Sequence, residues 1–137
     1  MSEPVTERRF QDTALATNVA LPNAATVKNT AGIDLGKTTP FPITEKFYVK
    51  LATGVATGAN NKNITIKMQD SADNTTFANI SAVGALTVTD ANGGGYPAAS
   101  LTVGLPPATR RYIRASATGE ANGGNAADGT LTVTLLF

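Results

Sequence analysis

Apolar and polar residues alternate along short segments in the last two-thirds of the chain. In FYVKLA (47–52) and in ITIKMQ (64–69), bulky apolar residues occupy every second position over most of the segment. Successive side chains of a strand point to opposite faces, so each segment predicts a strand with one buried face. Further strands are predicted at 75–81, 86–89, 101–105, 110–118 and 129–137.

Turn-forming residues separate these strands, and no helical stripe of apolar residues is found. The segments 53–63, 90–95 and 120–129 are rich in Gly and Asn and are predicted to be exposed loops. About seven strands at this spacing predict an all-β fold, an antiparallel β-sandwich or jelly roll. The last two strands, 110–118 and 129–137, are expected to pair as a hairpin across the tip at 120–129.

The first third of the chain has a different character. Residues 1–12 are polar, and residues 13–45 carry mostly small apolar side chains together with Pro22, Pro40 and Pro42. Short extended pieces are predicted at 14–20, 25–28 and 32–35, and proline restricts such pieces to sheet edges or arms. We therefore expect an extended N-terminal arm at 1–45, which would lie along a neighbouring molecule, and a β-sandwich domain at 46–137. The alternative is a tail at 1–12 followed by strands that pack on the chain's own core.

Composition excludes several classes of function. Charged residues make up only 15% of the 137 residues and the net charge is +1, which disfavours nucleic-acid binding. The chain has no Cys and no His, the residues that supply most thiolate and transition-metal chemistry, so no cofactor and no catalysis are expected. The N-terminus lacks the apolar region of a signal peptide, and no segment is apolar enough to span a membrane, so a soluble chain made in the cytoplasm is expected.

Two polar clusters have the composition of possible ligand sites. Asp70, Ser71, Asp73 and Asn74 carry several oxygens within five residues, which could bind calcium. The same residue types are preferred in turns because their side chains bond nearby backbone amides, and a strand must reverse here, so a turn is the favoured interpretation. The glycine-rich loop at 90–95 lacks the following helix that a phosphate site would need, and it is also interpreted as a loop.

One basic and aromatic cluster is a candidate contact surface. Arg110, Arg111 and Arg114 occur with Tyr112, and Tyr96 is expected to join them. Arg and Tyr are enriched at interface hot spots, which favours protein docking, whereas the simpler interpretation is a solvated strand face. The residues predicted to contact a partner protein or a neighbouring subunit are Arg8, Arg9, Phe10, Phe41, Tyr96, Arg110, Arg111, Tyr112 and Arg114.

An ordered series of segments resembles the capsid cement, or decoration, proteins of tailed bacteriophages. The series is QD (11–12) with Ala- and Thr-rich residues after it, IDLG (33–36), FYVKL (47–51), KMQDSADNTTF (67–77), LPP (105–107), RRYIR (110–114) and GTLTV (129–133). The resemblance covers roughly residues 11–137 and rests on the order of the segments. It implies a trimeric β-sandwich or jelly-roll subunit on the outer capsid surface of the virion. Such a subunit clamps neighbouring major capsid proteins and carries out no catalysis.

Two other functions fit the same class of fold. A carbohydrate- or receptor-binding module of a phage tail or head fibre would need exposed aromatic rings, for which Tyr48, Tyr96 and Tyr112 are the candidates. Another structural component of the virion is the third possibility, and the sequence hardly distinguishes it from a cement protein.

Overall fold

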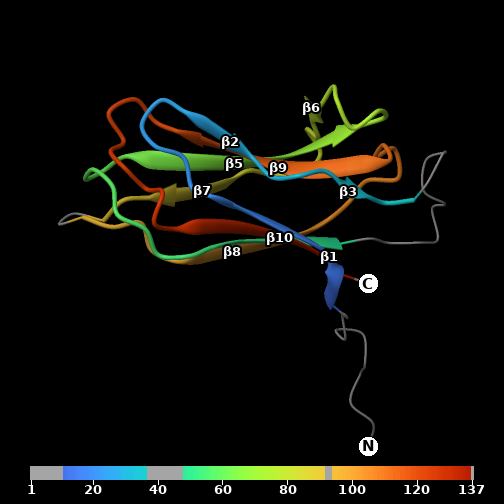
Figure 1. Ribbon diagram of the computed structural model, residues 1–137, viewed down its shortest axis with the longest axis horizontal. Coiled ribbons are helices and arrows are strands. Elements are labelled where there is room, and N and C mark those ends of the chain that lie inside the picture. The colour runs from blue at the N-terminus through green and yellow to red at the C-terminus, as the bar shows by residue number, and fades with distance from the viewer. Residues whose placement is uncertain (1–10, 37–47, 92–93, 137) are drawn as a thin grey trace, which may run out of the picture.

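Two β-sheets packed face to face form the protein (Figure 1). The computed structural model describes residues 11–36, 48–91 and 94–136. These residues contain no helix, and within them no segment could cross a membrane as a helix. The predicted all-β sandwich is confirmed.

Within the described residues, sheet A contains four strands and sheet B contains six. Sheet A has the order β1 (Gln11–Ala20), β10 (Thr130–Leu136), β4 (Tyr48–Thr53) and β8 (Ala99–Gly104). Sheet B is built on β9 (Tyr112–Gly119) and β5 (Asn63–Ser71). The short strands β2 (Val27–Asn29) and β3 (Ile33–Asp34) pair with β9, and β6 (Ala78–Asn79) and β7 (Leu86–Thr89) pair with β5.

The chain crosses repeatedly between the sheets, which is the strand order of a jelly roll. β1, β4, β8 and β10 lie in sheet A, and the strands between them in sequence lie in sheet B. β9 and β10 therefore face each other across the core, and the predicted hairpin between them is wrong. The segment 120–129 connects the two sheets instead of closing a hairpin.

The core confirms the alternation seen in the sequence. Ile64, Ile66 and Met68 of β5 are at most 1% exposed, and Val49 and Leu51 of β4 are fully buried. The residues between them in β5 point outward. Removal of apolar side chains from water drives this packing, at roughly 1.5–3 kcal/mol for each fully buried large side chain.

The described part of the predicted arm belongs to the sandwich. β1 pairs antiparallel with β10, and β2 and β3 pair with β9. Leu21 is fully buried and Ile33 is 5% exposed, and both lie in the core cluster. The domain boundary at residue 45 is thus corrected, because residues 11–36 supply strands and core side chains. Residues 1–10 and 37–47 lie outside the described part of the chain.

One predicted strand is much shorter than expected. Only Ala78 and Asn79 of the segment 75–81 form a strand, paired with Asp70 and Gln69 of β5. Ile80 is 8% exposed and belongs to the core cluster.

Candidate interaction surface

The polar cluster after β5 is a turn. Oδ1 of Asp73 accepts hydrogen bonds from the backbone amides of Thr75 (2.9 Å) and Thr76 (2.8 Å) and from the hydroxyl of Ser71 (2.8 Å). These donors lower the pKa of Asp73 to about 2, the amide of Thr76 contributing most. Asn74 adopts a left-handed backbone conformation with φ of 59°. The predicted turn is confirmed, since the carboxylate is occupied by the chain's own donors.

Asp70, at the end of β5, fixes Arg110. The guanidinium donates to Oδ1 of Asp70 from Nε (3.1 Å) and Nη2 (2.7 Å), and the backbone amide of Arg110 donates to Oδ2 (2.9 Å). The Asp70 side chain is only 13% exposed. This pair therefore holds the loop before β9 against the end of β5.

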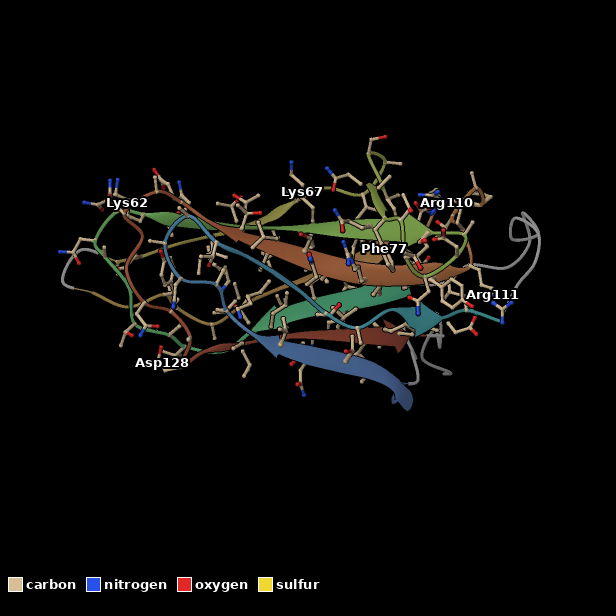
Figure 2. The ribbon with its side chains drawn as sticks, turned by 45° about the horizontal axis from the view of Figure 1, so that its top comes forward. Lys62, Lys67, Phe77, Arg110, Arg111 and Asp128 are labelled. Atoms are coloured by element: carbon tan, nitrogen blue, oxygen red, sulfur yellow. The ribbon has the colours of Figure 1, made fainter. Side chains whose placement is uncertain are left out.

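Arg111 is neutralised in the same way by the other edge of sheet B. Its guanidinium makes a two-point contact with the carboxylate of Asp34, with Nε to Oδ1 at 2.8 Å and Nη2 to Oδ2 at 2.9 Å. It also lies 5.2 Å from the centre of the Tyr112 ring. Arg111 is the main cause of the lowered pKa of Asp34, about 2. Arg110 and Arg111 lie at the same end of the sandwich, opposite Lys62 and Asp128 (Figure 2).

Arg114 differs from both neighbours because it contacts no carboxylate among the described residues. Its Nε donates to Oε1 of Gln69 (2.8 Å), and its guanidinium lies 4.0 Å from the centre of the Phe77 ring. Gln69 in turn donates from Nε2 to Oδ1 of Asn79 (3.0 Å). The guanidinium is thus fixed by an amide and an aromatic ring, and burial lowers its pKa.

Arg114 lines a depression of about 530 Å³ on the outer face of sheet B. We call it the outer groove. It is lined by Val27, Asn29, Thr65, Lys67, Gln69, Asn79, Arg114, Ser116 and Thr118. The residues from β5 and β9 are those between the buried positions of these strands. Side chains of β2 and β6 lie on its two sides.

The lining of the outer groove contains two cations and no anion. Neither Lys67 nor Arg114 forms an ion pair within the described residues. Glu120 lies in an adjoining depression that shares Thr65 and Thr118 with the groove. Its carboxylate accepts from the backbone amide of Asn63 (2.8 Å). The positive potential is consequently concentrated toward the Arg114 end.

Tyr96 is not part of the arginine cluster, which corrects its assignment as a surface contact. It is 1% exposed and bridges to Ala56 in the loops at the opposite end of the sandwich. Burial, together with the nearby charges of Asp90 and Glu120, raises its pKa. Asp90, 1% exposed, has no hydrogen-bond partner for either carboxylate oxygen among the described residues.

The remaining predicted contacts are only partly placed. Arg110, Arg111 and Tyr112 lie together at one end of the sandwich, and Arg114 lies on the outer face of sheet B; Arg8, Arg9, Phe10 and Phe41 lie outside the described residues. The sequence pattern does not identify the other residues of the outer groove. The signal was present in the polar positions of the strands at 64–69 and 110–118, but nothing in the sequence showed that these two strands are neighbours.

No protein-family model matches the chain, and no curated protein matches it either. Among solved structures, one similar chain comes from the Bacillus endospore appendages, which form a family of disulfide-linked pili. The identity is 16% and the TM-score 0.46, with 100% of this chain and 96% of that chain covered.

Proposed function

We propose that this protein is a non-catalytic structural component of a bacteriophage virion. It binds the outside of the capsid and clamps neighbouring major capsid proteins, which stabilises the head. The ordered segments at 11–137 that resemble cement proteins support this proposal. The subunit acts as a homotrimer, so that several weak contacts to the capsid add up to firm attachment.

The outer groove is the structural observation that carries the proposal. Three of its polar side chains, Gln69, Asn79 and Arg114, are held by hydrogen bonds to one another, and it presents cations that the described residues leave unneutralised. A preorganised polar surface loses little side-chain entropy on binding, and charge complementarity steers a partner into register. These properties suit a contact between proteins.

Binding to capsid shells tests this proposal. Purified protein is mixed with expanded shells of the phage that encodes it, assembled without this protein, and bound protein is measured by sedimentation. We expect saturable binding to the shells. In DNA-filled heads, bound protein should raise the temperature at which the DNA is released. The mass of the free protein, 14.0 kDa per chain, is expected to be about 42 kDa by light scattering if it trimerises. Failure to bind shells would exclude a cement function.

A carbohydrate- or receptor-binding module of a tail or head fibre is the second candidate. The amide and hydroxyl groups of the outer groove favour it, because such groups hydrogen-bond sugars. The groove lining, however, contains no aromatic residue, and the nearby Phe77 ring is covered by Arg114. Binding to a glycan array, together with failure to bind shells, would favour this function over the first.

A further inference from the structure

The outer groove has the dimensions of a short extended peptide. Three cross-strand pairs of β5 and β9 form its floor: Thr65 with Thr118, Lys67 with Ser116, and Gln69 with Arg114. Four residue steps along a strand span about 13 Å, at roughly 3.3 Å per residue. An extended segment of about five residues covers this length, and its first, third and fifth side chains would face the floor.

The two ends of the groove differ in chemistry. Val27 lines the Thr118 end and is 53% exposed, which makes it one of the large apolar residues that the described surface leaves open. Arg114 lines the other end, and Lys67 lies between them. A complementary segment therefore has an apolar side chain at one end and carboxylates at the middle and the other end.

Arg114 is held ready for a carboxylate. Nε is occupied by Gln69, and the ring of Phe77 lies against the guanidinium. The terminal nitrogens, Nη1 and Nη2, have no hydrogen-bond acceptor among the described residues. In Arg111, by contrast, Nη2 is already bound to Asp34. A carboxylate that approaches Arg114 gains charge-assisted hydrogen bonds without first displacing an acid of the chain.

Other classes of ligand fit the groove less well. Two cations give too small an electrostatic footprint for a nucleic acid, whose affinity depends on many phosphate contacts. A sugar would lack an open aromatic ring on which to stack. A protein segment uses the hydroxyls, the amides and both cations.

We propose that the outer groove binds an extended segment of a partner protein, with one carboxylate on Arg114, a second beside Lys67 and an apolar side chain against Val27. This inference deepens the proposed capsid contact, on which it rests for the identity of the partner. In that setting the segment belongs to the major capsid protein.

A peptide titration tests the groove without any capsid. The probe is the blocked peptide Ac-Val-Thr-Glu-Thr-Glu-NH2, and its control carries Gln in place of both Glu residues. Binding is followed by NMR at low salt through the side-chain amides of Gln69 and Asn79 and the backbone amide of Ser116. We expect the acidic peptide to bind at least tenfold more tightly than its control. Equal affinities, or shifts confined to residues outside the groove, would overturn the proposal.

Matched variants separate Arg114 from its neighbours. Arg114→Gln is expected to lower the affinity for the acidic peptide at least fivefold, and the exposed Lys67→Gln at least twofold. Arg111→Gln is the control and should change the affinity for the acidic peptide by less than twofold, because Arg111 is already paired with Asp34. If Arg114→Gln unfolds the chain, Lys67→Gln decides the matter alone. Equal losses in the Arg111 and Arg114 variants would refute the assignment.

Two further comparisons distinguish this inference from the proposed function. The first comparison titrates a tetramer of galacturonic acid in place of the peptide. Binding of this tetramer without binding of the peptide would refute the peptide as the ligand and assign an acidic sugar to the groove. Binding of shells by the Arg114→Gln and wild-type proteins alike would refute the groove as the capsid contact and leave the cement function standing. Binding of the peptide by a protein that does not bind shells would refute the cement function and leave the groove as a peptide-binding site.

Discussion

Replacement of Leu21 by alanine tests whether the first third of the chain is part of the core. Leu21 follows β1, is fully buried, and donates a backbone hydrogen bond to the carbonyl of Gly129 (3.0 Å). Its side chain belongs to the same core cluster as residues of both sheets. Alanine leaves the backbone bond in place and removes the apolar contacts alone.

The expected loss follows from burial. A fully buried leucine loses its transfer free energy and leaves a cavity, which together cost about 3 kcal/mol. With an m-value of about 1.5 kcal/mol/M for a domain of this size in urea, the unfolding midpoint should fall by about 2 M. Equilibrium unfolding followed by circular dichroism measures this shift. Val27→Ala is the matched control, since Val27 lies in the same third of the chain, is 53% exposed, and should cost no more than about 0.5 kcal/mol.

A midpoint for Leu21→Ala within about 0.3 M of wild type would refute this reasoning, because a fully buried leucine cannot be truncated without a measurable loss. Residues 11–36 would then act as an arm that the remaining strands do not need. An equal loss in the Val27→Ala control would also count against the argument.

Three other predictions concern single interactions. Arg110→Ala should lower the free energy of unfolding by roughly 1–2 kcal/mol, because it removes the guanidinium from the mostly buried Asp70 and leaves only the backbone amide at position 110 as donor. Arg111→Ala should cost much less, because that ion pair is exposed, and urea unfolding of both variants measures the difference. Because the pKa of Asp73 is lowered from 3.8 to about 2, its contribution is fully present above pH 3.8 and is lost as the pH falls toward 2. In Asp73→Asn, the free energy of unfolding should therefore change less with pH between 3.8 and 2 than in the wild-type protein. The same pH dependence in both proteins would contradict the lowered pKa of Asp73. Gly58→Ala should lower the free energy of unfolding by about 1–3 kcal/mol, because a Cβ there would meet the Tyr96 ring and Asp90. A melting temperature equal to that of the wild-type protein would contradict this close packing.

The pattern of apolar and polar residues correctly predicts which face of a strand is buried. In β5, the alternation of apolar and polar residues correctly assigns Ile64, Ile66 and Met68 to the core. The preference of Asp and Asn for turns correctly predicts the reversal after Ser71. Both signals are local, since they depend only on the side chain and its immediate neighbours in the chain.

Which strands become neighbours in a sheet depends on residues far apart in the sequence. The incorrect predictions of the hairpin and the arm arise for this reason. The strands at 110–118 and 129–137 are adjacent in sequence, which favours a hairpin, yet in a jelly roll they lie in opposite sheets. The small side chains in the first third of the chain favour an arm, although Leu21 and Ile33 are buried. The outer groove cannot be predicted for the same reason, because Gln69 and Arg114 meet only when β5 and β9 pair.

A cryo-EM reconstruction of capsid shells mixed with this protein tests the central claim most directly. We predict that the sandwich lies on the outer capsid surface, with the outer groove against a major capsid protein and an acidic side chain on Arg114. Shells that carry no such density, or particles that carry the protein only on tail or fibre structures, would contradict it.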